Sequence, residues 1–310
     1  MKTSFKIVVG IDYTPSSDNA ARYAAKMALA TGSTLTFHHV YGKGRLGFPK
    51  EFAALEKVDE SQDEFEESKL QQYIEHLLRD AEIDPGSIEA KYTGAEGDIT
   101  NELINEAKEV RADFIILGTH GGNGLKENFF GGHAWEAIKK EFVPVLAIPP
   151  GAEYSKIKSI VFATEYRQSE IPLIKQLVSY AEGFKAQLIV LHVTNNIFSS
   201  EFDHEMFDKF KKEVEEVVSY KKLSISLVKN DTLIEGINNF CSKVQADWLV
   251  MSHEKTSFLI GLFNPVSFTK KMSFHTRIPL FAIPDGYISK EKGKKKQPRE
   301  GHVEYGDFFF

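Results

Sequence analysis

Short apolar runs recur along the chain between longer segments whose apolar residues have helical spacing. Most of these runs show no alternation of apolar and polar residues, which is typical of parallel strands buried on both faces. In the first half of the sequence we therefore predict strands at Lys6–Ile11, Leu35–Tyr41, a weaker Ile88–Tyr92, Phe114–Leu117 and Val143–Ile148.

Helical segments separate these runs. Ser16 or Ser17 can cap a helix that continues to Thr31, after which Gly32 stands at the position of a helix C-cap. Further helices are predicted in the later part of Lys50–Leu78, from Gly97 to Val110, and over Ala134–Lys140. Strands that alternate with helices predict an α/β fold with a parallel sheet.

The pattern then begins again, so the chain is a tandem repeat. The matching segments are Lys6–Asp12 with Ser159–Glu165, Ser33–Val40 with Ala186–Val193, and Pro144–Pro149 with Pro279–Pro284. The later matches lie closer together in sequence, so the first copy carries an insertion, most simply around Gly42–Asp59. Repeats of this length are domains, because solenoid periods run from roughly 20 to 50 residues. We expect two domains at residues 1–152 and 153–286, followed by a tail at 287–310.

The composition is that of an ordinary soluble protein. The chain has 310 residues, of which 42% are hydrophobic, and its net charge of -6 gives no argument for binding nucleic acid or an acidic membrane. No apolar run is long enough to span a membrane, and the first residues lack a signal-peptide pattern, so a cytoplasmic protein is expected. Cys241 has no partner for an internal disulfide, and we expect it to be a small buried residue.

A glycine-rich loop follows the fourth apolar run and is the main candidate for a ligand site. Gly118, Gly121 and Gly131 have the spacing G-x2-G-x9-G, and Gly132 follows. Glycines let backbone N–H groups approach a polyphosphate, and the start of the next helix adds partial positive charge. The spacing is neither that of a Walker A loop nor the G-x-G-x-x-G of dinucleotide folds. The alternative interpretation is a tight surface loop without a ligand.

Asp12 is a second candidate because it ends the first apolar run. Ligands of open parallel sheets gather beyond the carboxyl ends of the strands, where this carboxylate can accept a hydrogen bond from a base or a ribose. The backbone of Val40 would line the same crevice. A turn or capping role for Asp12 is the alternative.

Taken together, the strand–helix alternation, the Asp12 turn, the glycine spacing and the closing Val143–Ile148 run resemble a tandem universal stress protein over about residues 4 to 285. The resemblance implies two Rossmann-like, adenine nucleotide α-hydrolase-like domains, each with a five-stranded parallel sheet of order 3-2-1-4-5 and helices on both faces. It implies that the copies pair through their fifth strands, with a homodimer as a further option. It also implies a stress-response sensor that binds ATP or AMP, with or without Mg2+, in domain 1.

The resemblance also assigns nucleotide-binding residues in this sequence. They are Ile11, Asp12, Thr14, Val40, Gly118, His120, Gly121, Gly131, Gly132 and His133. Gly132 stands where the family normally has Ser or Thr, and the missing hydroxyl would weaken nucleotide binding about tenfold or more unless His133 or Thr119 replaces it. The resemblance implies at most slow ATP hydrolysis. The sequence itself has no G-x-S-x-G elbow and no paired acid for general acid–base work, which argues against an enzyme of a related fold.

The second copy has lost the glycine loop. Its segment from Ser252 to Pro265 keeps Gly261 but also holds Phe258, Leu262 and Phe263, which would obstruct a polyphosphate. Glu165 replaces Asp12. A structural role or a different ligand is expected for domain 2.

Other interpretations stay open. The chain could be a nucleotide-independent scaffold or chaperone-like module, or an enzyme of a related fold. A metal site built from His38, His39, His120 and His133 has no supporting spacing. The basic run Lys290–Arg299 predicts a disordered tail, and we hypothesise that Phe308–Phe310 dock in an apolar groove of this chain or of a partner.

Overall fold

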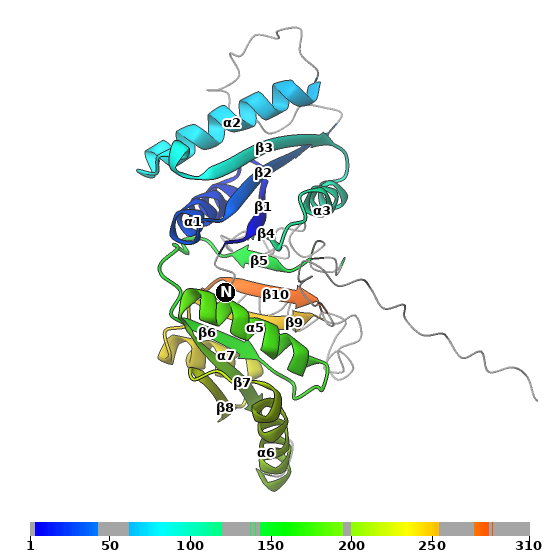
Figure 1. Ribbon diagram of the computed structural model, residues 1–310, viewed down its shortest axis with the longest axis vertical. Coiled ribbons are helices and arrows are strands. Elements are labelled where there is room, and N and C mark those ends of the chain that lie inside the picture. The colour runs from blue at the N-terminus through cyan, green and yellow to red at the C-terminus, as the bar shows by residue number, and fades with distance from the viewer. Residues whose placement is uncertain are drawn as a thin grey trace, which may run out of the picture.

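The computed structural model describes residues 4–42, 62–119, 137, 140, 143–194, 200–253, 276–284 and 287. Its strands form a single ten-stranded sheet in the order β3-β2-β1-β4-β5-β10-β9-β6-β7-β8 (Figure 1). The strands are β1 (Lys6–Ile11), β2 (Thr34–Tyr41), β3 (Glu89–Glu96), β4 (Phe114–Gly118), β5 (Val145–Ile148), β6 (Ser159–Ala163), β7 (Gln187–Thr194), β8 (Leu223–Lys229), β9 (Trp248–His253) and β10 (Leu280–Pro284). The predicted α/β fold with a parallel-dominated sheet is confirmed.

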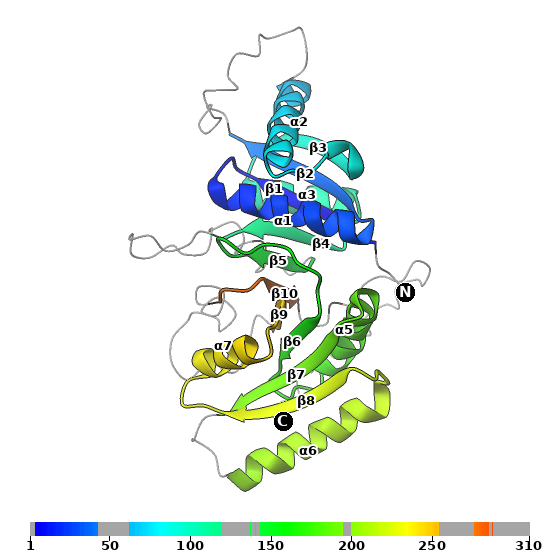
Figure 2. The same cartoon turned by 90° about the vertical axis from the view of Figure 1, so that its left-hand side faces the viewer.

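Neighbouring strands are parallel within each half of the chain and antiparallel where the halves meet. In the first half β1 lies between β2 and β4, and in the second half β6 lies in the same way between β7 and β9. The last strands of the two halves, β5 and β10, pair antiparallel with Leu146 opposite Phe281. They meet in the middle of the molecule, so that one sheet runs through both halves (Figure 2).

Helices cover both faces of this sheet. Those described are α1 (Pro15–Thr31), α2 (Gln62–Asp80), the 3-10 helix η2 (Pro85–Ser87), α3 (Ile99–Glu109), α5 (Glu170–Phe184), α6 (Ser200–Val217) and α7 (Leu233–Lys243). In the first half, α1 and α3 flank the strands on opposite sides (Figure 1). Nearly all of the expected insertion, the glycine loop after Thr119 and the tail lie outside the described residues.

Helix α1 shows how the local sequence sets an element that later positions the candidate site. Its N-cap is Thr14, whose side chain accepts a hydrogen bond from the Ser17 N–H, while the Ser17 hydroxyl accepts one from the Thr14 N–H. The expectation that Ser16 or Ser17 is the cap was wrong. Pro15 lacks an N–H and has a helix-like φ, which suits the first helical position and places the cap one residue earlier. Gly32 closes the helix at φ 66°, as predicted.

The apolar core forms two layers, one on each face of the sheet. One layer joins α1, α2, α5 and α6 to side chains such as Val9 and Phe162, and the other joins α3 and α7 to side chains such as Val8 and Val161. This division follows from the period of two along a strand. Each layer contains residues of both halves, so both layers continue across the junction between the halves.

Aromatic side chains bind the two halves along their junction. The indole Nε1 of Trp248 on β9 donates a hydrogen bond of 2.8 Å to the hydroxyl of Tyr23 on α1, and both side chains are buried. The rings of Phe5 and Tyr180 stack with their centroids 5.4 Å apart. Because buried aromatic contacts and a shared sheet cross the junction, the halves form one body.

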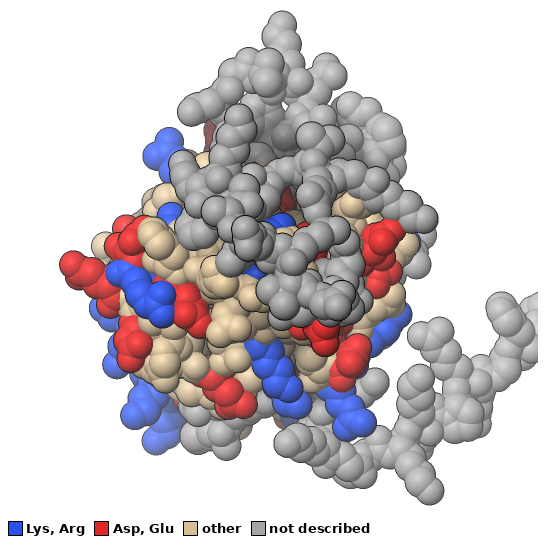
Figure 3. Space-filling model, turned by 90° about the horizontal axis from the view of Figure 1, so that it is seen from above, with Lys and Arg blue, Asp and Glu red and all other residues tan. Residues whose placement is uncertain are grey.

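The described surface carries charges of both signs. On the face seen in Figure 3, Lys and Arg side chains are intermingled with Asp and Glu side chains among the residues that are coloured. None of the described helices combines the length and the apolar character needed to cross a membrane.

Candidate functional site

Three strands of the first half end side by side, and we use the word edge for this side of the sheet, which is formed by the carboxyl ends of its strands. Asp12 follows β1, Val40 lies near the end of β2, and Gly118 ends β4. Since β1 pairs with both β2 and β4, these residues lie beside one another where the strand order reverses. This is the place at which open α/β sheets bind ligands.

The turn between β1 and α1 is held by its own polar groups. The Asp12 carboxylate accepts hydrogen bonds from the Thr14 N–H at 3.0 Å and the Thr14 hydroxyl at 2.6 Å. The Ser17 hydroxyl oxygen accepts from the N–H groups of Asp12 at 3.4 Å and Thr14 at 3.2 Å. Asp12 is therefore a turn residue, and its side chain is also exposed at the edge of the sheet.

Gly118 allows β4 to approach the start of α1 very closely. A Cβ at this position would overlap the backbone carbonyl of Ser16 and lie 2.9 Å from the Ser17 nitrogen. No side chain fits there while the helix keeps its place. The glycine at position 118 thus has a packing cause of its own, whether or not a ligand approaches it.

Sequence reasoning missed an aromatic pair at this edge. Tyr13 has a positive φ of 59°, and its ring packs against His39 at a centroid distance of 4.5 Å and against Tyr73 of α2 at 4.9 Å. The Nδ1 of His39 lies 2.8 Å from the Ile11 carbonyl oxygen, so this imidazole hydrogen-bonds to the last residue of β1. Ile11 itself is buried. The signal was present, because Tyr13 and His39 recur as Tyr166 and His192 in the second copy.

Ionisable side chains of α1 and α2 surround the aromatic pair. The Lys69 Nζ lies 3.4 Å from the Glu66 carboxylate, and both side chains are almost fully buried. Tyr73 donates a hydrogen bond of 2.8 Å to Asp18. Burial raises the pKa of the Asp18 carboxyl and of the Tyr13 and Tyr73 hydroxyls. These side chains of α1 and α2, together with the Tyr13–His39 pair, can offer fixed dipoles and aromatic faces to a ligand.

The corresponding edge of the second half is filled by longer side chains. Arg167, Glu170 and Ser252 stand at the positions of Thr14, Ser17 and Gly118, and they contact one another. The aromatic pair is kept, with the Tyr166 and His192 rings 4.0 Å apart and the His192 Nδ1 2.8 Å from the Thr164 carbonyl oxygen. The two edges therefore differ in the residues that would face a ligand.

The predicted site residues divide into two groups. The structure brings together Ile11, Asp12, Thr14, Val40 and Gly118, whereas His120, Gly121, Gly131, Gly132 and His133 lie outside the described residues. Cys241 is buried on α7, as predicted, and burial raises the pKa of its thiol to about 12. In the described part of the chain, no group of His, Cys, Asp and Glu residues could hold a metal ion. The chemistry that this edge offers is hydrogen bonding and packing.

Comparisons with known proteins agree with this architecture. The model of the universal stress protein family matches residues 4–149. A universal stress protein from Archaeoglobus fulgidus DSM 4304 has a TM-score of 0.64 at 12% sequence identity, over 92% of this chain and 100% of that chain. A functionally unknown protein from Pseudomonas aeruginosa PAO1 has a TM-score of 0.56 at 15% identity, over 90% and 92%. Identities this low show the shared fold. The search of curated proteins gives no match.

Proposed function

We propose that this chain, which belongs to the universal stress protein family, binds an adenine nucleotide in its amino-terminal half and acts as a stress-response sensor. The binding unit would be residues 1–152. Residues 153–286 would form a second domain without a nucleotide site, and residues 287–310 a tail. ATP or AMP, with or without Mg2+, would be the ligand of the first domain.

One observation carries this proposal: at three equivalent positions, the strand ends of the first half bear shorter side chains than those of the second half. Thr14, Ser17 and Gly118 leave the edge between β1 and β4 clear of long side chains from these positions, next to the exposed carboxylate of Asp12. A carboxylate at this edge is suited to accept hydrogen bonds from ribose hydroxyls or a base amino group.

The phosphates would be held elsewhere than in the β1–α1 turn. The N–H groups of Asp12 and Thr14 already donate to the Ser17 hydroxyl. The free N–H donors that a polyphosphate needs would come from the loop with Gly121, Gly131 and Gly132. Asp12 and Val40 would meet the adenosine, and His133 or Thr119 would supply the polar contact that Gly132 cannot.

Calorimetric titration of the full chain with ATP and with AMP tests the proposal. Gly131→Val places a branched side chain in the loop and should abolish the heat of binding that the wild type gives. Gly261→Val, in the loop of the second half, is the matched control and should bind as the wild type does. The absence of binding heat at millimolar nucleotide in the wild type would refute the proposal and favour a nucleotide-independent scaffold.

The contribution of Asp12 can be measured in the same way. Asp12→Ala removes one charged acceptor, and the loss of such a hydrogen bond, about 1.5 to 3 kcal/mol, should weaken binding roughly tenfold or more. Glu165→Ala changes the equivalent residue of the second half and should leave the affinity unchanged. Equal losses in both variants would contradict a site confined to the first half.

A further inference from the structure

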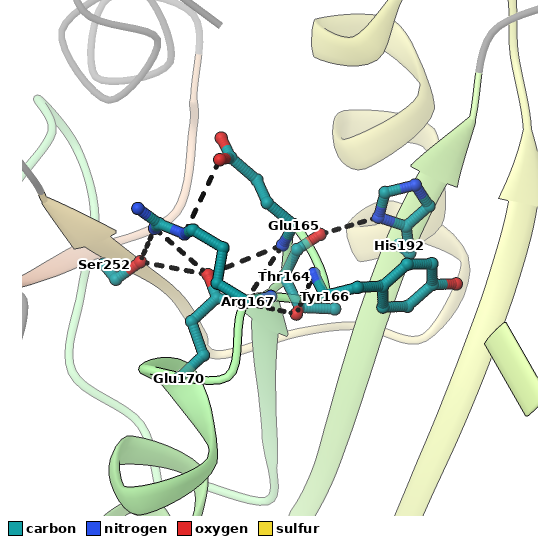
Figure 4. Close-up of polar contacts among 7 residues, drawn as sticks. All are labelled: Thr164, Glu165, Tyr166, Arg167, Glu170, His192 and Ser252. Atoms are coloured by element: carbon teal, nitrogen blue, oxygen red, sulfur yellow. Dashed lines mark hydrogen bonds and ion pairs between the residues drawn. The ribbon is translucent and has the colours of Figure 1, made fainter. Parts of the chain in front are cut away.

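Five hydrogen-bond donors converge on one buried carboxylate in the second half. Glu170, the first residue of α5, is 0% exposed. Its oxygens accept from the Thr164 hydroxyl at 2.7 Å, the Ser252 hydroxyl at 3.1 Å and the Nη2 of Arg167 at 3.2 Å. They also accept from the backbone N–H groups of Glu165 at 3.2 Å and Arg167 at 3.1 Å. Figure 4 shows these groups pointing toward the Glu170 carboxylate from β9 and from the segment between β6 and α5.

This set of donors resembles the shell that a protein builds around a bound anion. It combines two backbone N–H groups, two hydroxyls and a guanidinium, all at hydrogen-bonding distance from the two oxygens of one carboxylate. Charge-assisted bonds from Arg and backbone N–H groups are the usual means of holding oxyanions. Here the anion belongs to the chain itself.

The first half shows that the turn does not require a carboxylate. There the N–H groups of Asp12 and Thr14, which correspond to those of Glu165 and Arg167, donate to the hydroxyl of Ser17. A hydroxyl is thus sufficient to satisfy both amides. The carboxylate of Glu170 serves additional side-chain donors, namely Thr164, Arg167 and Ser252, at whose positions the first half has Ile11, Thr14 and Gly118.

We propose that the second half contains an oxyanion site that is filled from within by the Glu170 carboxylate. The site is formed by Thr164, Arg167, Ser252 and the two turn amides, and its ligand class is a carboxylate or another small oxyanion. Because Glu170 occupies it permanently, this half is closed to anions from solution and keeps its turn without a ligand. The Arg167 side chain is 21% exposed and marks the side from which an external anion could enter.

This inference goes beyond the proposed nucleotide site and does not depend on it. Glu165, whose carboxylate lies 3.6 Å from the Nε of Arg167, offers a second negative charge on the solvent side. The cluster therefore carries two carboxylates for one guanidinium, which disfavours an additional anion as long as Glu170 is in place.

Chemical rescue of Glu170→Ala tests the proposal in the full chain. The substitution removes the CH2–COO⁻ group, and acetate can replace it. We expect the variant to melt below the wild type in sodium chloride. At the same ionic strength, sodium acetate or formate should raise its melting temperature by roughly 2 °C or more, with an effect that saturates as a bound ligand requires.

Two matched variants separate rescue from a general salt effect. Glu165→Ala removes the neighbouring, partly exposed carboxylate and should show no difference between acetate and chloride. Glu170→Gln fills the same volume with a neutral amide and should also be insensitive to acetate. The proposal is overturned if Glu170→Ala melts equally in both salts, or if acetate shifts all variants and the wild type alike.

A folding failure of Glu170→Ala does not leave the question open. Glu170→Ser introduces the residue that the first half has at this position, so both turn amides keep an acceptor, while the side chains of Thr164, Arg167 and Ser252 lose their bonds to the carboxylate. We expect this variant to fold and to gain the same stabilisation by acetate. Its insensitivity to acetate would reject the site.

Discussion

The two halves of the chain make the same turn after their first strand but satisfy it with different side chains. In the first half a hydroxyl, Ser17, accepts from both turn amides. In the second half a carboxylate, Glu170, accepts from the same amides and also from Arg167 and Ser252. Both turns thus use the same two backbone donors. The side chain at one helix position, Ser17 or Glu170, determines which further donors surround the acceptor.

The difference shows that three replacements go together. Helix α1 begins at Pro15, whereas α5 begins at Glu170, two residues after the position equivalent to Pro15. Because α5 starts later, Ser252 can hold a side chain where Gly118 cannot. Arg167 fits beside Ser252 and supplies the charge that a buried Glu170 needs. The second half therefore holds a polar cluster whose members satisfy one another.

The largest effect is expected for Arg167→Ala. It leaves the buried Glu170 carboxylate without its cation, and removing one partner of a buried ion pair costs about 3 kcal/mol or more of the free energy of unfolding. The equivalent change in the first half, Thr14→Ala, removes a helix cap and one exposed hydrogen bond to Asp12, and should cost about 1 kcal/mol. Urea denaturation of both variants measures the difference, and equal losses would show that Glu170 does not depend on Arg167.

The next effect concerns the glycine at the end of β4. Gly118→Ser, which copies the second half, forces the new Cβ into the backbone of α1 and should cost about 2 to 3 kcal/mol. The reverse change, Ser252→Gly, removes two polar contacts without creating overlap and should cost about 1 to 2 kcal/mol. If Gly118→Ser were as stable as the wild type, α1 could retreat freely and the packing account of Gly118 would be wrong.

A third prediction tests the junction between the halves. Tyr23→Phe removes the acceptor of the Trp248 indole N–H in a region where both side chains are buried. A buried donor without a partner costs about 1 to 3 kcal/mol, and we expect about 2 kcal/mol by urea denaturation. Tyr154→Phe is the matched control, because the Tyr154 ring packs edge-on against Tyr23 in the same cluster but is more exposed. It should cost less than half as much.

The fold could be predicted from the sequence because its signals are local and repeated. Unbroken apolar runs gave the buried parallel strands, and Gly32 marked the end of α1. Boundaries were less accurate where hydrogen bonding decides them. Thr14 rather than Ser16 or Ser17 caps α1, because Pro15 takes the first helical position.

The candidate site was predicted only in part. Asp12, Val40 and Gly118 were expected at one edge, and the sheet order brings them there. Glu170 and Arg167 were not singled out, because acidic and basic residues at a helix start are common and nothing in the sequence shows that they face each other. Their partnership depends on the position of Ser252, which is distant in sequence.

The smallest expected effect is a pH dependence of stability. It arises from His38 on the opposite face of the sheet, where the two halves differ. His38 is buried, with its Nδ1 2.8 Å from the Thr93 hydroxyl and 3.9 Å from the Glu106 carboxylate, whereas Leu191 stands at the equivalent position. Burial lowers the pKa of His38 from 6.5 to about 4. The unfolded chain therefore binds a proton that the folded chain does not, and stability is lost as the pH falls from about 6.5 toward 4, at about 1 kcal/mol per pH unit. His38→Leu should reduce this slope in urea denaturation between pH 6 and pH 5, and His39, whose pKa burial also lowers, should contribute the part that is left. Burial raises the pKa of Glu106, so this carboxyl opposes the loss, and Glu106→Gln should make the slope steeper. An unchanged slope in both variants would show that His38 and Glu106 are not the groups responsible.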